Sequence, residues 1–98
     1  MAVYVICYDL VRATESDYKN VHEAIHAISN DWAHLQLSTF IVNSSLSAFQ
    51  IRDRLRPHFT LDEKLVVAQI GNQVAGLHKL SKQVGEWFDR NGIPSTDV

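Results

Sequence analysis

The amino-acid sequence predicts an α/β fold of the α+β sandwich type, with helices on one face of a small sheet. Two nearly continuous apolar runs, residues 2–8 and 64–71, are typical of buried strands. Between these runs, apolar residues recur at helical spacing, and the order strand, helix, strand, helix, strand fits within 98 residues. We therefore expect two layers that share one core.

The chain has the size of one domain. Its 98 residues are 46% hydrophobic and 20% charged, which is enough for a two-layer core. We expect residues 1–92 to form a single domain and residues 93–98 to form a flexible tail, because Gly92 and Pro94 end the last helix. A chain this short buries a small fraction of its surface, so we also expect a homodimer.

Composition bears on location and on partners. No basic leader precedes the first strand and no apolar run could span a bilayer, so we expect no membrane association. The single cysteine, Cys7, is interpreted as a core residue of a cytoplasmic protein. A net charge of -2 indicates no general basic character. We interpret a local group of cations, Arg52, Arg54 and Arg56, as a solvated helix face.

The first helix is predicted over about residues 16–30. Thr14 and Ser16 are candidate N-caps, and Asp17 complements the positive start of the helix. The apolar stripe has spacings of three and four and consists of Tyr18, Val21, Ile25, Ile28 and Trp32.

The next segment is rich in β-branched and aromatic residues. We expect this segment to form either one long strand or a very tight pair of strands.

The second half of the chain shows weaker signals. Ser47 and Gln50 have capping-box spacing, which predicts a helix over about residues 46–56. The apolar run that begins at Lys64 should lie beside the first strand. Residues 72–80 are ambiguous, and a final helix begins near Ser81.

Asp9 is the one charged residue of the first strand and stands at its end. Asp is disfavoured within strands, so this position has two interpretations. The carboxylate either bonds the backbone of the following turn, or it acts as a metal ligand or general base.

Two short motifs carry a resemblance to a known family. Tyr8-Asp9-Leu10 closes the first strand, and Gln36-Leu37-Ser38-Thr39-Phe40 follows the first helix with Gln-x-Ser-x-Phe spacing. In these motifs the chain resembles the small CRISPR adaptation subunit, the second Cas protein, with its VapD-like and SinR-like relatives. The resemblance covers roughly residues 2–90 and includes Trp87.

The resemblance implies a ferredoxin-like βαββαβ fold with an antiparallel sheet and a C-terminal helix. This fold requires a short strand near residues 34–37 that turns tightly into another near residues 39–43, with one continuous strand as the alternative. The resemblance also implies a homodimer that brings two copies of Asp9 together. It implies that Asp9 is the catalytic residue and a ligand of Mg²⁺ in an endonuclease acting on RNA or DNA. Tyr8, Ser38 and Phe40 match the remaining motif positions, where they would contact nucleic acid or support the site. Other members of the family are noncatalytic bridges, so a dimeric scaffold that holds a nucleic-acid or protein partner is the alternative function.

The matched residues also have structural interpretations. Tyr8 would face the helices, Ser38 would satisfy a hydrogen bond of the strand ladder, and Phe40 would belong to the core. The chain departs from the family after Asp9: the family has a run of Lys and Arg there, whereas this chain has Arg12-Ala13-Thr14-Glu15-Ser16-Asp17.

The predicted first helix contains a literal HExxH motif, His22-Glu23-Ala24-Ile25-His26. Two histidines at this spacing bind zinc beside a general-base Glu in metalloproteases. With the apolar stripe turned inward, His22 and His26 flank the core and Glu23 points toward water. We interpret the motif as a chance match, and keep a zinc hydrolase as a third functional class.

Overall fold

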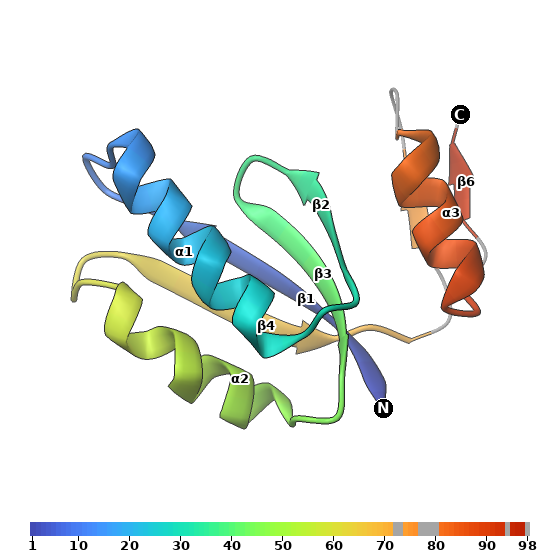
Figure 1. Ribbon diagram of the computed structural model, residues 1–98, viewed down its shortest axis with the longest axis horizontal. Coiled ribbons are helices and arrows are strands. Elements are labelled where there is room, and N and C mark those ends of the chain that lie inside the picture. Colours follow the sequence, from blue (N-terminus) through green and yellow to red (C-terminus); the bar gives the residue numbers. More distant parts are fainter. Residues whose placement is uncertain (72–73, 77–80, 94, 98) are drawn as a thin grey trace.

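A four-stranded antiparallel sheet forms the centre of the molecule (Figure 1). The computed structural model describes residues 1–71, 74–76, 81–93 and 95–97. The strands lie in the order β2-β3-β1-β4 and are β1 (Ala2–Asp9), β2 (Trp32–Gln36), β3 (Thr39–Ser44) and β4 (Lys64–Gln69). Helix α1 (Glu15–Ile28) joins β1 to β2, and helix α2 (Ala48–Leu55) joins β3 to β4. This order of elements is the predicted ferredoxin-like βαββαβ fold.

The prediction of two strands in the middle segment is confirmed. β2 and β3 form an antiparallel hairpin closed by Leu37 and Ser38, and the register shifts between His34 and Gln36. The expectation that β4 lies beside β1 is also confirmed, with Asp9 directly opposite Lys64.

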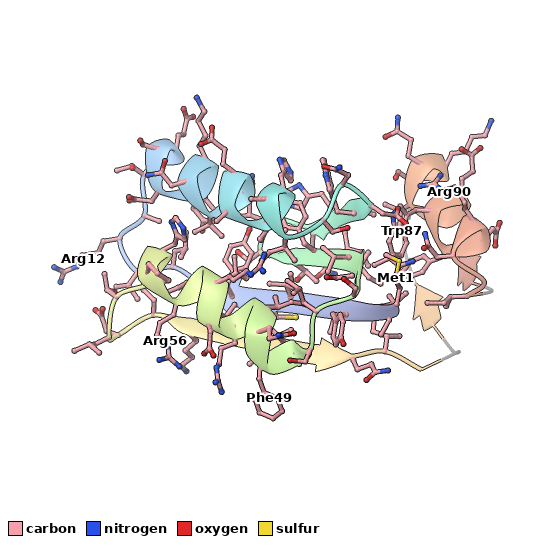
Figure 2. The ribbon with its side chains drawn as sticks, turned by 60° about the horizontal axis from the view of Figure 1, so that its bottom comes forward. Met1, Arg12, Phe49, Arg56, Trp87 and Arg90 are labelled. Atoms are coloured by element: carbon pink, nitrogen blue, oxygen red, sulfur yellow. The ribbon has the colours of Figure 1, made fainter. Side chains whose placement is uncertain are left out.

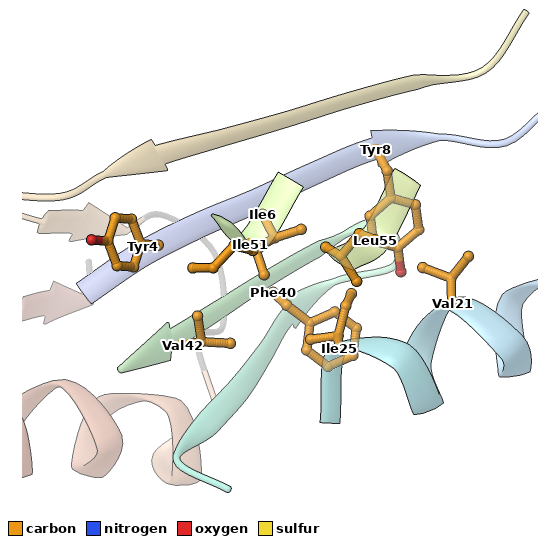
Figure 3. Close-up of a cluster of buried hydrophobic side chains, with 9 residues drawn as sticks. All are labelled: Tyr4, Ile6, Tyr8, Val21, Ile25, Phe40, Val42, Ile51 and Leu55. Atoms are coloured by element: carbon orange, nitrogen blue, oxygen red, sulfur yellow. The ribbon is translucent and has the colours of Figure 1, made fainter. Parts of the chain in front are cut away.

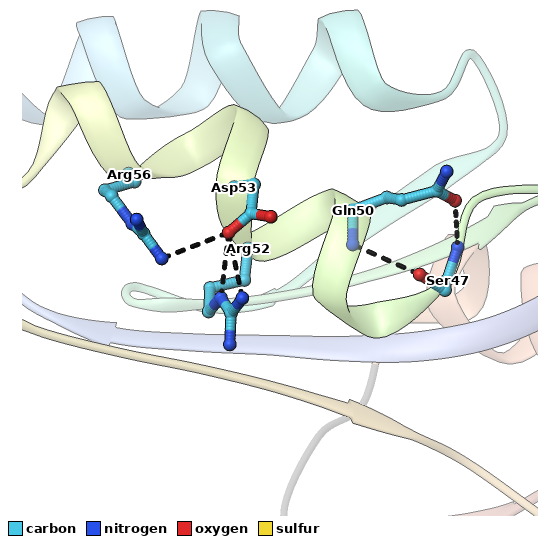
Figure 4. A network of polar contacts seen from close by, with 5 residues as sticks. All are labelled: Ser47, Gln50, Arg52, Asp53 and Arg56. Carbon is cyan, nitrogen blue, oxygen red and sulfur yellow. Dashed lines mark hydrogen bonds and ion pairs between the residues drawn. The ribbon is translucent and has the colours of Figure 1, made fainter.

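Both helices that face the main core begin at a capping box. The Thr14 hydroxyl accepts from the Asp17 N–H and the Asp17 carboxylate accepts from the Thr14 N–H, so Thr14 rather than Ser16 is the cap of α1. Ser47 and Gln50 form the same reciprocal pair at the start of α2 (Figure 4). Such caps satisfy backbone donors that a helix start leaves free. Beyond α2, the chain continues into the 3-10 helix η1 (Arg56–His58).

The main core lies between the sheet and the helices α1 and α2 (Figure 3). Alternate residues of β1 point into it, and α1 contributes two positions of its predicted stripe. Burial of each aliphatic side chain here contributes about 1.5–3 kcal/mol. The buried members are Tyr4, Ile6, Tyr8, Val21, Ile25, Phe40, Val42, Ile51 and Leu55.

The C-terminal helix α3 (Lys82–Arg90) packs against the other face of the sheet. Its partner Ile41 lies between the main-core residues Phe40 and Val42 on β3, so it points to the opposite side, and Ala33 of β2 is directly opposite Ile41. The expectation of helices on one face therefore holds for α1 and α2 only. This second cluster consists of Ala33, Ile41, Val84, Trp87, Phe88 and Ile93.

Of the segment 93–98, expected to form a flexible tail, the structure describes Ile93 and Ser95–Asp97. Ile93 is buried, and its side chain belongs to the second hydrophobic cluster together with residues of α3. Ser95–Asp97 form strand β6, which pairs in parallel with β5 (Val74–Gly76) in a separate two-stranded sheet. The remaining positions of the ambiguous segment 72–80 lie outside the described residues.

Part of the second face of the sheet is covered by none of the helices among the described residues. Cys7 is half-buried rather than a core residue, and its neighbours on β4, Val66 and Ala68, are exposed. Val66 keeps 58% of its surface accessible. The first strand is therefore fully covered on one face only. Among the described residues, no helix is long and apolar enough to cross a membrane.

Candidate functional site

A surface hollow at the end of β1 gathers three of the four predicted site residues. It measures about 250 Å³ and is lined by Cys7, Tyr8, Asp9, Ser38, Thr39, Lys64 and Val66. Asp9, Tyr8 and Ser38 therefore meet at one place, whereas Phe40 does not line this hollow. The hollow lies on the part of the sheet that none of the described helices covers.

Asp9 is exposed and stands opposite Lys64 in the strand register. Directly opposed residues of antiparallel strands project to the same face, so the carboxylate and the ammonium group share the hollow. In the part of the chain that the structure describes, no hydrogen bond or ion pair engages the Asp9 carboxylate. This carboxylate remains available to a ligand.

Glu63 performs the turn chemistry that one interpretation assigned to Asp9. Its two carboxylate oxygens accept from the Val11 N–H and the Thr60 N–H, each at 2.9 Å. Hydrogen bonds from these backbone groups, that of Thr60 first, lower the pKa of the Glu63 carboxyl. The loop after β1 is thus tied to the loop before β4 without help from Asp9.

Tyr8 is buried and faces the helices. Its hydroxyl donates to the Leu37 carbonyl at 3.3 Å and lies 3.0 Å from His22 Nε2. Burial, followed by the nearby Tyr18, raises the pKa of Tyr8 to about 12. The phenol therefore stays protonated at neutral pH and ties β1 to α1 and to the β2–β3 turn.

Ser38 and Phe40 have mainly structural contacts. The Ser38 carbonyl accepts from the Tyr8 N–H at 3.1 Å, which extends the ladder between β1 and β3. Phe40 is buried to 1% exposure and stacks on His34 with ring centroids 4.2 Å apart. A ring so enclosed cannot serve as a platform for a nucleobase.

The two histidines of the HExxH motif have partners in the fold. His22 contacts the Tyr8 hydroxyl, and the His26 ring stacks on Trp32 with centroids 4.0 Å apart. Burial, followed by His34 and His26, lowers the pKa of His22. The described residues contain no group of three or more side chains placed to hold a metal ion.

Lys64 and Glu63 are site residues that the sequence analysis did not single out. A signal for Lys64 was present, because it begins a strand expected beside the first one. In an antiparallel pair, the start of one strand meets the end of the other, which places Lys64 at Asp9. Glu63 carries no comparable signal, since its partners Thr60 and Val11 lie in irregular loops.

The fold and this hollow define a ferredoxin-like α+β protein with a free carboxylate at the end of its first strand. Comparison of the chain with protein-family models yields no match, and comparison with curated proteins yields none either.

Proposed function

We propose that the protein is a homodimeric, magnesium-dependent endonuclease with Asp9 as its metal ligand. The observation that carries the proposal is the unpaired Asp9 carboxylate on an uncovered, partly apolar part of the sheet. Association of two chains through this face would bury Val66 and Ala68 and bring two Asp9 side chains together.

The residues of the hollow fit a magnesium ion. Each chain supplies one hard oxygen ligand group at Asp9, and Mg²⁺ is commonly held by one or two carboxylates while it keeps several waters. Bound there, the ion supplies an activated water and stabilises charge on a phosphoryl oxygen. Lys64, in the same hollow, would contact a phosphate of the substrate as a point charge.

Cleavage assays test the proposal. Labelled single-stranded RNA and duplex DNA are incubated with the wild type, Asp9→Asn and Asp89→Asn, each with magnesium or a chelator. Asp89 is exposed on α3 and provides the same chemical change on another element. Magnesium-dependent cleavage that disappears only in Asp9→Asn supports the proposal. Equal cleavage by Asp9→Asn overturns it.

A noncatalytic dimeric scaffold is the second candidate. Lys64 favours it, because a cation opposite Asp9 opposes the binding of a second cation. If none of the three proteins cleaves and light scattering shows a dimer, the result would support the scaffold function. The next step would then be to identify the nucleic-acid or protein partner. A monomer at high concentration would contradict both candidates.

A further inference from the structure

The outer side of α2 and the first residue of η1 together carry an exposed aromatic ring beside two arginines. Phe49 is 69% exposed and belongs to neither hydrophobic cluster. The Arg52 guanidinium carbon lies 5.4 Å from the centroid of its ring. Figure 2 shows Phe49 and Arg56 projecting from the same side of the helix. We call Phe49, Arg52 and Arg56 the α2 strip.

Asp53 holds both guanidinium groups of the α2 strip in place (Figure 4). Its Oδ1 atom accepts from Arg52 Nε and Nη2 at 3.0 and 2.9 Å, and from Arg56 Nη2 at 3.1 Å. A guanidinium has five N–H donors, so the donors not directed at Asp53 remain for another acceptor. Because these ion pairs are exposed, they contribute little stability, and their main effect is to orient the arginines.

The α2 strip lies beside the β4 edge of the sheet, on the face opposite to the one that carries Asp9. α2 packs against β4, which is an edge strand of the main sheet. Pro57, just after the strip, lines a hollow together with Leu10, the residue that follows Asp9. The strip therefore approaches the end of the sheet where Lys64 and Asp9 share their own hollow.

We infer that single-stranded nucleic acid binds along the α2 strip, with one base stacked on Phe49 and phosphates contacted by Arg52 and Arg56. Guanidinium groups pair with phosphate oxygens through two parallel N–H donors, and an exposed phenyl ring accepts the face of any base. The bases of a duplex are stacked on one another, so the aromatic ring favours a single strand. The inference rests on the proposed function and adds a binding surface beside the β4 edge, around which the strand would pass to reach Asp9 on the other face.

Binding is measured separately from cleavage, in the Asp9→Asn background and without metal. Fluorescence anisotropy records the affinity for labelled oligouridine RNA, oligothymidine DNA and a duplex of equal length. We expect either single strand to bind more tightly than the duplex. Adding Phe49→Ala should weaken single-strand binding about tenfold. Adding Arg52→Ala or Arg56→Ala should each reduce the slope of log affinity against log salt by about 0.7.

Arg54→Ala is the matched control. It removes the same charge from the same helix, but Arg54 is separated from Arg52 and Arg56 by two positions, about 200° around the helix. Phe49→Leu keeps an apolar side chain without a ring, so its weaker binding would reflect lost stacking rather than an altered fold. Three results would overturn the inference. Phe49→Ala could leave the affinity for single strands unchanged, or Arg54→Ala could reduce that affinity as much as Arg52→Ala and Arg56→Ala do. An acidic peptide could also displace the labelled strand as well as an unlabelled strand does.

The two proposals fail in different ways. If single-strand binding depends on the α2 strip but the wild type cleaves nothing, the binding proposal stands and the nuclease proposal fails. Magnesium-dependent cleavage with an unchanged KM in Phe49→Ala would support the nuclease proposal and overturn the proposal that the α2 strip binds the strand.

Discussion

The hydroxyl oxygen of Tyr8 lies 3.0 Å from Nε2 of His22, which joins the end of β1 to the middle of α1 beneath the candidate site. The same hydroxyl donates to the Leu37 carbonyl in the β2–β3 turn. One phenol thus fixes three elements around the base of Asp9.

Tyr8→Phe should destabilise the protein by about 1 kcal/mol, because it removes a partly buried hydrogen bond while leaving the ring in the core. Urea denaturation followed by circular dichroism measures the change. Tyr4→Phe is the control, since Tyr4 is buried on the same face of the same strand. An equal effect of the two substitutions would contradict the role assigned to the Tyr8 hydroxyl.

The stability of the protein should depend on pH through His22. Its pKa lies below the usual value of 6.5 because burial, His34 and His26 disfavour the charged form. The His22 ring therefore binds a proton more readily in the unfolded chain than in the folded one. Its contribution to the free energy of unfolding is complete above pH 6.5 and is lost as the pH falls toward the lower folded pKa. NMR titration of the His22 ring should give a midpoint below 6.5.

His34→Asn should move the His22 midpoint upward, because it removes a neighbouring positive charge. A midpoint at or above 6.5 in the wild type would contradict the environment described for His22.

Glu63→Gln should reduce the acid sensitivity of the fold. The folded pKa of Glu63 is lower than its usual 4.5, so its contribution is present above pH 4.5 and is lost as the pH falls through the folded pKa. Thermal melts between about pH 6 and pH 3 should show a smaller decrease for the variant than for the wild type. At neutral pH, the variant should be the less stable protein, because an amide has one acceptor oxygen for two backbone donors. If the Tm of the wild type and that of Glu63→Gln decrease equally as the pH falls, this account of Glu63 is wrong.

Arg12→Gly should stabilise the loop after β1. Arg12 has a φ of 53°, a left-handed conformation that costs a side-chain-bearing residue about 1–2 kcal/mol. Glycine removes that cost but adds freedom to the unfolded chain, so we expect a gain of about 0.5–1 kcal/mol. Arg12→Ala keeps the Cβ atom and should give no gain. Equal stability of the Gly and Ala variants, measured by urea denaturation, would show that backbone strain at Arg12 is negligible.

Local patterns alone predicted most of the main domain. The apolar run of β1, the stripe of α1 and the capping box at Ser47 each depend on residues close together in the chain, and each predicted its element. The place of Asp9 at the end of β1 was also predicted, whereas the orientation of Tyr8 toward the helices was one of two interpretations.

The sequence by itself therefore determined the succession of strands and helices through β4 and the place of Asp9 at the end of β1. The number of strands between the two helices and the core position of Phe40 stayed open. Only the tertiary structure decided that α3 covers part of the second face, that Ser95–Asp97 pair with β5, and that Glu63 rather than Asp9 closes the turn. The physical reason is the long sequence separation between the residues in contact. The geometry of such contacts follows from the packing of whole helices and strands, and a local sequence pattern contains no information about that packing.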